Sequence, residues 1–389
     1  MQDLDIQKLT SIVGQQNITQ NPTDLLIYAT DAAQIKGRAL AVIWPKTTGE
    51  ITQIIAYANK KDIQITPRGA GTSLTAGAVP QNSIILDLSK MDKITQETSD
   101  TITVEAGTIL DDLNTHLRQK DKYFPVIPSS DTVATIGGML ATNAAGTRAI
   151  KYGKTSDWTE EIEIVTGKGD IIKTKDINEF ASTEGILCII TKATLKTTSL
   201  PEQTSITTYE FSTAEELVEK VKQLKKDKSI AAIEYIDPFT SSMQDETPKY
   251  HLLIEYENNT GTHKTTEEIE KAWKQRKGIG TVLSAAGYPK IEDPKIPEKN
   301  IAPFLNWLKE QNIPNFGHIG YGIIHCRIKP DHDLDEFYRQ VKNHNGQVSG
   351  EHGIGLTKKQ YIPQTLKDEL KKKKQKYDPK NILNRGKMI

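Results

Sequence analysis

PRGAGTSLTAGAVP, residues 67–80, follows a short strand-like segment and combines glycines with hydroxyl side chains. Gly69 and Gly71 allow positive φ and a close approach to the backbone, and the N–H groups of such a loop can point at a diphosphate. An ordinary glycine-rich turn has the same composition. The stretch therefore raises the question of a nucleotide cofactor without answering it.

Two common nucleotide-binding motifs do not fit the chain. A Rossmann fingerprint requires a third glycine after the G-x-G of residues 69–71 and a helix that begins there, and this context is missing. A Walker A loop around GKT at 153–155 requires glycine at position 148, where Arg148 stands. We therefore expect a dinucleotide to be bound by another fold.

A second stretch, IPSSDTVATIGGMLATNAAGTRAIKYGKTSDW at 127–158, repeats the chemistry of the first. It is rich in small side chains and in glycines whose backbone is accessible. Together the two stretches predict a long groove for an extended cofactor that carries phosphate groups.

Composition narrows the class of partner. The chain has 389 residues, which predicts two or three structural units. Its 50 basic and 50 acidic side chains balance, which argues against nucleic acid and favours a small molecule. Cys188 and Cys326 form no C-x-x-C pair, and neither a membrane span nor a signal peptide is visible. We expect a soluble cytoplasmic protein, and peripheral attachment to a membrane stays open.

Hydrophobic periodicity predicts α/β structure in the first half of the chain. Strand-like segments at 39–45, 83–88 and 101–107 surround a helix at 47–61, where Thr47 and Glu50 have the spacing of a capping box. Residues 130–200 continue as mixed α+β structure. The lysine-rich run at 371–376 is interpreted as a solvated helix face.

The pattern of hydrophobic and polar residues changes at 201–204. An amphipathic helix follows, with Ser212 and Glu215 as its predicted capping box. Further helices over 301–310 and 333–341, and strand-like HLLIEYE at 251–257, predict a second α+β unit. We therefore place a domain boundary near residue 203.

NFGHIGYGIIHCRI, residues 315–328, is also strand-like and holds His318 and His325 among glycine and isoleucine. A third polar motif, SGEHGIG, places Glu351 beside His352. Two imidazoles and a carboxylate suit Zn²⁺ or Mn²⁺ with coordination positions left open, as in catalytic sites. Packed structural histidines are the competing interpretation.

The order of these motifs resembles that of the FAD-linked D-2-hydroxyacid dehydrogenases, the group of D-lactate dehydrogenase, glycolate oxidase and D-2-hydroxyglutarate dehydrogenase. STEGILCIITKATLK at 182–196 and DPKNILNRGK at 378–387 complete the set, so the resemblance covers nearly the whole chain. It implies an α+β, two-lobed FAD-binding domain of the vanillyl-alcohol-oxidase/p-cresol-methylhydroxylase type, over 1–203 and completed by 350–389. A shortened α+β substrate or cap domain over 204–349 is implied as well.

The resemblance also implies which residues contact FAD. The two glycine-rich loops clasp its pyrophosphate and ribityl chain, the segment 183–191 reaches the flavin side, and an asparagine near the C-terminus approaches the isoalloxazine. No His or Cys occurs in 67–80, where some relatives attach FAD covalently, so noncovalent FAD is expected. The implied contacts are Arg68, Gly69, Gly71, Thr72, Ser73, Ser130, Gly137, Gly138, Thr142, Asn143, Gly146, Ile189 and Asn384.

For the chemistry, the resemblance implies oxidation of a small D-2-hydroxy acid to the 2-keto acid, with hydride transfer to flavin N5. It also implies that His318, His325 and Glu351 hold the divalent metal, that His352 accepts the hydroxyl proton, and that Arg276 holds the substrate carboxylate in a bidentate fork. A surface helix arginine is the alternative interpretation of Arg276.

The chain departs from the family pattern at the histidine motif. Relatives commonly read G-H-x-G-D-G-N-x-H, whereas Tyr321 and Ile323 stand at the Asp and Asn positions. Polar neighbours of that kind orient metal-bound imidazoles, so weaker metal binding is expected. The stretches 258–271 and 326–348 are also shorter than is usual, which predicts an open site or one completed by a homodimer partner or accessory subunit.

Two other functions compete with the dehydrogenase hypothesis. The first is a noncatalytic or accessory FAD-binding subunit of an oxidase complex, and the second is a flavoenzyme that oxidises another alcohol without metal. Retention of Arg276, Glu351 and His352 favours a catalyst over an accessory subunit. The sequence identifies neither the hydroxy acid nor the electron acceptor.

Overall fold

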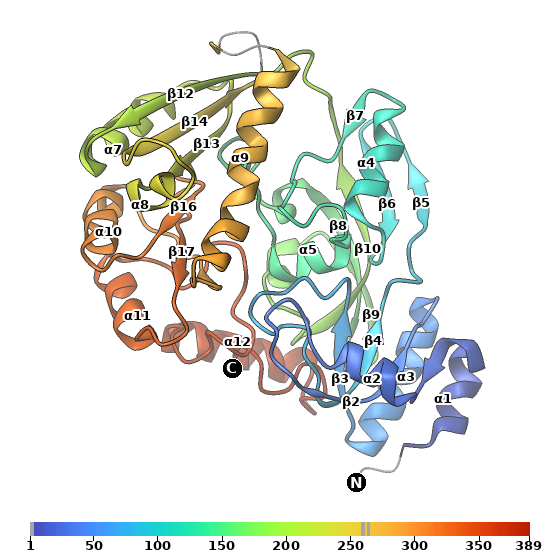
Figure 1. Ribbon diagram of the computed structural model, residues 1–389. Coiled ribbons are helices and arrows are strands. Elements are labelled where there is room, and N and C mark those ends of the chain that lie inside the picture. The colour runs from blue at the N-terminus through green and yellow to red at the C-terminus, as the bar shows by residue number, and fades with distance from the viewer. Residues whose placement is uncertain (1–3, 258–260, 263–264) are drawn as a thin grey trace.

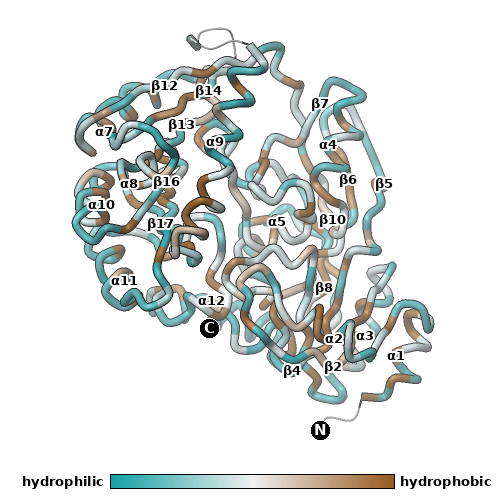
Figure 2. Tube along the Cα trace, viewed as in Figure 1, coloured by the Kyte–Doolittle hydropathy of each residue, from teal (hydrophilic) through white to brown (hydrophobic). Residues whose placement is uncertain are grey.

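The computed structural model describes residues 4–257, 261–262 and 265–389, and folds them as two α+β lobes that lie side by side (Figure 1). The long helix α9 (Thr266–Ala285) lies on the side of the second lobe that is turned toward the first. Figure 2 shows apolar segments along β8 (Thr159–Thr166) and β10 (Cys188–Lys196) in one lobe and along β13 (Ile230–Ile236) and β14 (Tyr250–Tyr256) in the other. Each lobe therefore has a hydrophobic core of its own.

The first lobe begins with a four-stranded sheet in the order β1–β2–β4–β3, in which β2, β4 and β3 are parallel. Helix α3 (Thr48–Lys61) connects β2 to β3 and buries one apolar face that includes Ile51 and Ile55. The Glu50 N–H donates to Thr47 Oγ1, which confirms Thr47 as the cap, but the Glu50 carboxylate accepts the N–H of Lys46 rather than that of Thr47, so only half of the predicted capping box is formed. The other elements here are α1 (Ile6–Val13), η1 (Gln15–Asn17), β1 (Ile18–Thr19), α2 (Pro22–Tyr28), β2 (Arg38–Ile43), β3 (Gln64–Arg68) and β4 (Gln81–Asp87).

A five-stranded antiparallel sheet, ordered β5–β6–β10–β8–β9, completes the first lobe. Helix α5 (Ile136–Thr142) contacts β10 (Cys188–Lys196) and β6 (Thr101–Glu105), which brings the second glycine-rich stretch next to the 183–191 segment. The remaining elements are β5 (Ile94–Glu97), α4 (Leu110–Arg118), β7 (Lys122–Tyr123), α6 (Ala149–Tyr152), η2 (Thr155–Trp158), β8 (Thr159–Thr166), β9 (Ile171–Thr174), η3 (Ile177–Glu179) and β11 (Thr198–Ser199).

The second lobe is built on a six-stranded antiparallel sheet in the order β12–β14–β13–β16–β17–β15. Its elements are β12 (Ser205–Phe211), α7 (Ala214–Leu224), β13 (Ile230–Ile236), α8 (Pro238–Ser242), β14 (Tyr250–Tyr256), β15 (Lys290–Glu292), α10 (Glu298–Glu310), β16 (Asn315–Gly317), β17 (His325–Ile328) and α11 (Leu334–Asn343).

Two local predictions in this lobe are wrong. The capping box of α7 is formed by Thr213 and Glu216, one residue later than Ser212 and Glu215, because Thr213 Oγ1 accepts the Glu216 N–H at 3.2 Å and the Glu216 carboxylate accepts the Thr213 N–H. The stretch 315–328 is not one strand: a turn at 318–322 separates β16 from β17, so the two strands pair with each other. His325 pairs with Phe316 in this hairpin, and His318, directly after β16, lies beside His325 with their Nε2 atoms 3.3 Å apart.

The last forty residues return to the first lobe, as Figure 1 shows for α12 (Gln364–Tyr377). Ile354, Leu370 and Leu383 pack into the core of that lobe, and Leu383 forms a parallel bridge with Ile65 of β3. The exact domain boundaries stay a prediction.

The interpretation of residues 371–376 as a solvated helix face is wrong for Lys374. Its side chain is buried, and Nζ donates to the Ile186 carbonyl at 2.6 Å and to Asp378 at 2.7 Å. Lys374 thus ties α12 to the segment 183–191. No helix in the described part of the chain is both long and apolar enough to cross a membrane.

Candidate functional site

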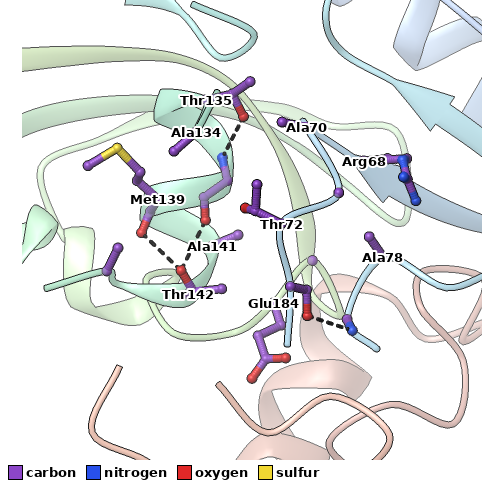
Figure 3. Close-up of a pocket in the computed structure, with 18 of the residues that line it drawn as sticks. Arg68, Ala70, Thr72, Ala78, Ala134, Thr135, Met139, Ala141, Thr142 and Glu184 are labelled. Carbon is purple, nitrogen blue, oxygen red and sulfur yellow. Dashed lines mark hydrogen bonds between the residues drawn. The ribbon is translucent and has the colours of Figure 1, made fainter. Parts of the chain in front are cut away.

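A cavity of about 420 Å³ lies in the first lobe between the two glycine-rich stretches. Figure 3 shows Arg68, Ala70, Thr72 and Ala78 on one side, facing α5 with Thr135 and Thr142. Residues 183–190 form a third part of the wall, and Glu351 and His352 from the returning C-terminal segment also line the cavity. The motifs of four separate parts of the sequence therefore meet around one space.

Most of the residues predicted to contact the cofactor line this cavity: Arg68, Gly69, Gly71, Thr72, Ser73, Ser130, Gly137, Gly138, Thr142 and Ile189. Three predicted contacts lie outside the lining. Asn143 accepts the Ser156 N–H, Gly146 packs against the Ile127 carbonyl, and Asn384 donates to the Glu184 carbonyl at 2.7 Å. These three residues therefore support the cavity wall without lining the cavity.

The glycines of the first loop are required by close packing. A Cβ at Gly69 would lie 2.2 Å from Thr135 Oγ1, which caps α5 by accepting the Gly138 N–H. Gly71 has a φ of 71°, a backbone conformation that disfavours other residues. The loop can therefore lie directly on the start of α5, and the cavity wall there consists mainly of backbone.

The surroundings of Arg68 and Cys188 in the cavity wall limit what these two side chains can do. Arg68 Nη1 donates to the Thr30 carbonyl at 2.8 Å, and its guanidinium lies over the Tyr28 ring, so this cation is held at the cavity edge. Cys188 lines the cavity, and burial raises the pKa of its thiol. The thiol is therefore protonated and weakly reactive.

The predicted metal ligands come together beside the cavity. His318 Nε2 lies 3.3 Å from His325 Nε2, and Glu351 Oε1 lies 3.6 Å from His318 Nε2 and 3.4 Å from His325 Nε2. The two imidazoles are buried, and the three groups form a candidate metal site. His352 Nε2 lies 3.3 Å from the same carboxylate oxygen.

The two imidazoles have different surroundings. His318 Nδ1 donates to Glu234 Oε1 at 2.6 Å. Burial lowers the pKa of His318, but the carboxylates of Glu234 and Glu351 outweigh burial and raise it to about 9. His325 Nδ1 has no hydrogen-bond partner within the described residues, and burial lowers the pKa of this imidazole well below its ordinary value. His325 is held mainly by packing against Phe316 and His352.

Arg276 is buried rather than on the surface, with 9% of its area exposed. Its Nε and Nη2 both approach Glu234 Oε2, at 2.9 and 2.6 Å, and its guanidinium lies over the Phe316 ring. Nε–H and one N–H of Nη2 are therefore engaged, which leaves the second N–H of Nη2 and both N–H groups of Nη1 for another acceptor.

Asp293 organises the loop that carries Glu351 and His352. Its Oδ2 accepts the N–H groups of Gly350, Glu351 and His352 at 2.8 to 3.0 Å, and Lys358 Nζ donates to Oδ1. Burial would raise the pKa of Asp293, but Lys358 and His352 outweigh it and hold the pKa below the ordinary range. The carboxylate therefore stays charged and fixes three successive backbone groups.

Glu184 fixes the far side of the same loop. Its carboxylate accepts the N–H groups of Ile354 and Gly355, and it also lines the cavity. Burial raises the pKa of Glu184 to about 7, although the two N–H groups oppose this shift. The cavity wall and the loop of Glu351 are thus one connected structure.

Tyr321 and Ile323, at the positions of the family's Asp and Asn, do not contact the imidazoles through polar groups. Ile323 is fully buried and packs with Ala145 and Ala149 of the first lobe. The Tyr321 ring lies under Lys295 Nζ. These side chains join the two lobes by apolar packing instead.

Sequence reasoning missed Glu234, Asp293, Glu184 and Lys358. One signal was available for Glu234, because it is the single charged residue in the apolar strand IAAIEYI and a buried carboxylate needs a partner. Asp293 has no comparable signal, since its partners lie 56 or more residues away.

Two known family profiles match the chain. Residues 39–175 match the FAD binding domain, and residues 253–388 match the C-terminal domain of FAD linked oxidases. The first range contains both glycine-rich stretches, and the second contains all three predicted metal ligands.

Relatives of similar sequence cover nearly the whole chain. The glycolate oxidase subunit GlcD of Bacillus subtilis is 28% identical, over 98% of this chain and 96% of its own. A D-2-hydroxyglutarate dehydrogenase of Stutzerimonas stutzeri is 26% identical, over 99% and 98%. A D-lactate dehydrogenase of Archaeoglobus fulgidus is 26% identical, over 90% and 91%.

Solved structures of low sequence identity share the fold. Substrate-bound p-cresol methylhydroxylase matches with a TM-score of 0.75 at 14% identity, over 98% of this chain and 96% of that one. An alkyldihydroxyacetonephosphate synthase matches with a TM-score of 0.72 at 16% identity, over 97% and 84%. The predicted two-lobed fold of the vanillyl-alcohol-oxidase/p-cresol-methylhydroxylase type is confirmed.

Proposed function

Since this chain belongs to the FAD-linked oxidase family, we propose that it oxidises a small D-2-hydroxy acid, of the D-lactate or glycolate kind, to the 2-keto acid. The observation that carries the proposal is the continuity of the site: Glu351 and His352 line the same cavity as the two glycine-rich stretches. The names of the three relatives, all enzymes or subunits for 2-hydroxy acids, support this class of substrate.

FAD fits the cavity between residues 67–80 and 128–145. The wall there offers backbone and small side chains, which an extended diphosphate requires, and Gly69 leaves no room for a side chain between the loop and α5. Bound FAD supplies the acceptor for the hydride that leaves the carbon bearing the hydroxyl. We propose that it is held without a covalent bond.

His318, His325 and Glu351 would hold a divalent cation. Their ligand atoms are 3.3 to 3.6 Å apart, close to the spacing of about 3.3 Å between ligands that surround Zn²⁺ tetrahedrally at about 2.0 to 2.1 Å. Mn²⁺ is the other candidate. The cation supplies stabilisation of the negative charge that develops on the substrate oxygen.

His352 is the proposed base that accepts the hydroxyl proton. Its backbone is fixed by Asp293, its ring stacks on His325, its Nε2 lies 3.3 Å from Glu351 Oε1, and the residue lines the cavity. Burial lowers the pKa of His352, but Asp293 and Glu351 outweigh it and raise the pKa above the ordinary value. Only the neutral imidazole accepts a proton, and general base catalysis is most efficient when the pKa of the base lies near the working pH.

Arg276 is the proposed partner of the substrate carboxylate, which it would hold in a bidentate fork while also paired with Glu234. Nε and one N–H of Nη2 donate to Glu234 Oε2, which leaves the second N–H of Nη2 and both N–H groups of Nη1. We therefore propose that the substrate carboxylate accepts from Nη1 and Nη2 together.

The proposal is tested by anaerobic mixing of the FAD-loaded protein with D- and L-lactate, glycolate and D-2-hydroxyglutarate, followed at the flavin absorption band. Bleaching by one of the small D-2-hydroxy acids is expected, and by L-lactate it is not. A flavin that none of the panel reduces contradicts the proposal. It would favour an accessory subunit, the alternative suggested by the word subunit in the name of the Bacillus relative.

A further inference from the structure

We infer that Glu234 is a positioning residue of the metal site, which holds His318 with Nε2 free to bind a cation, and that Arg276 is the counter-ion of Glu234. The inference rests on the proposed metal site and deepens it. Neither residue is among the three candidate ligands.

The geometry divides the two oxygens of Glu234 between two partners. Oε1 accepts from His318 Nδ1 at 2.6 Å, and Oε2 accepts from Arg276 Nε and Nη2 at 2.9 and 2.6 Å. The carboxylate is fully buried, on the central strand β13, and therefore has no solvent to replace either partner. Strand β13, helix α9 and the β16–β17 hairpin meet at this one side chain.

The direction of each hydrogen bond is fixed by chemistry. A carboxylate only accepts and a guanidinium only donates, so the proton of the Glu234–His318 bond must sit on His318 Nδ1. A neutral imidazole protonated at Nδ1 has its lone pair on Nε2, the atom that faces His325 and Glu351. Glu234 thus selects the tautomer that can bind a metal.

Arg276 compensates the negative charge of the buried Glu234 carboxylate. A buried, unpaired carboxylate is strongly destabilising, and an unpaired guanidinium so close to the site would repel a divalent cation. Paired at 2.6 Å, the two charges offset each other. His325 has no equivalent, since its Nδ1 lacks a partner within the described residues. Of the two ligand imidazoles, only His318 is therefore oriented by a hydrogen bond at Nδ1, and Glu234 supplies it.

Glu234→Gln tests the inference because Arg276 dictates how the new amide must lie. The amide oxygen has to face the guanidinium donors, so the amide NH₂ faces His318 Nδ1 and donates to it. His318 then carries its proton on Nε2, which blocks that ligand. Zn²⁺ affinity should fall by about 10- to 100-fold, the usual cost of losing such a partner.

The double variant Glu234→Gln/Arg276→Met removes the constraint on the amide. Its oxygen can now turn to accept from His318 Nδ1, which restores the metal-binding tautomer. We expect the double variant to bind Zn²⁺ more tightly than Glu234→Gln alone. A residue with a merely structural role would show the opposite, since the double variant loses more contacts.

A matched control is available on the neighbouring strand β14. Glu255 has 1% of its area exposed and accepts from Arg148 Nε at 2.7 Å, but it does not contact the candidate ligands. Glu255→Gln should leave Zn²⁺ affinity within about threefold of wild type, because it perturbs no tautomer at the site.

The experiment is equilibrium dialysis of FAD-loaded, metal-stripped protein against buffered Zn²⁺ with elemental analysis, together with electron paramagnetic resonance of the Co²⁺ forms. Wild-type affinity in Glu234→Gln, or no recovery in the double variant, overturns the inference. If Glu234→Gln does not fold, the double variant is compared with Glu234→Leu/Arg276→Met, which offers His318 no acceptor; equal Zn²⁺ affinities of that pair overturn it. Wild type that binds no divalent cation contradicts the proposed metal site itself.

Discussion

The cavity wall over residues 67–78 and 128–145 is made of backbone, small side chains and hydroxyls, whereas the cluster around Glu351 is made of buried charged groups. In the first region the contacts are close packing of backbone and small side chains, as where Gly69 leaves room for Thr135 Oγ1. In the second, charged groups are held by charged partners far away in the sequence, such as Glu234 for His318. A single substitution should therefore act through packing in the cavity wall and through charge and hydrogen bonding in the cluster.

The largest effect is expected from His318→Ala. The variant loses one of three proposed ligands, so Zn²⁺ binding should disappear and substrate-driven flavin reduction should slow by at least about 100-fold. Its flavin spectrum should not change, because His318 does not line the cavity. Elemental analysis measures the bound Zn²⁺, and anaerobic stopped-flow measures the rate of flavin reduction. His116→Ala, at a partly exposed ion pair on α4, is the control and should retain metal and rate.

Asp293→Asn should have the next largest effect, on stability. The amide keeps the shape of the side chain but leaves Lys358 with a weaker partner and the three N–H groups with a neutral acceptor. The free energy of unfolding should fall by about 3 kcal/mol. Denaturant unfolding measures this value. Asp111→Asn, whose partner Arg118 is half exposed, should cost about 0 to 1 kcal/mol, and equal losses in the two variants would count against a special role for Asp293.

Gly69→Ala probes the cavity wall. Its Cβ would lie 2.2 Å from Thr135 Oγ1, so either the loop or the cap of α5 must move. We expect FAD binding to weaken by about 2 kcal/mol, or roughly 30-fold, by fluorescence titration. Gly278→Ala is the matched control, because nothing lies within 4 Å of the added Cβ in helix α9. That change should leave FAD affinity unaltered and stabilise the helix by roughly 0.5 to 1 kcal/mol.

The motifs of the cavity wall could be predicted from sequence because their glycines and hydroxyl residues stand together in two continuous stretches. The fold and the grouping of His318, His325 and Glu351 were accessible through the order of six motifs. The residues that hold the cluster in place could not be predicted, since nothing near Asp293 in the sequence indicates that it binds residues 349–352. For the same reason Arg276 was assigned to the substrate without its pairing to Glu234, and Asn384 was placed at the cofactor although its amide binds the Glu184 carbonyl.

Ile323→Asn should have the smallest effect and sharpens the comparison of this chain with its relatives. Restoring the family's Asn would be expected to tighten metal binding if the surroundings were polar. Ile323 is instead buried against Ala145 and Ala149, so the amide would lack partners and cost about 1 to 2 kcal/mol of stability. Thermal unfolding measures the loss of stability, and a Zn²⁺ binding experiment measures whether metal binding becomes tighter. Tighter Zn²⁺ binding without a loss of stability would show that this packing is easily rearranged.

The central claim is that FAD chemistry in the cavity depends on a cation held by His318, His325 and Glu351. It is tested most directly by anaerobic stopped-flow reduction of the wild-type flavin with a D-2-hydroxy acid, in protein verified as metal-free and again after Zn²⁺ or Mn²⁺ is added. We predict reduction that is slowed at least about 100-fold without metal and restored by its addition. Full-rate flavin reduction in the metal-free protein would contradict the claim and leave the two histidines a role in packing or proton transfer.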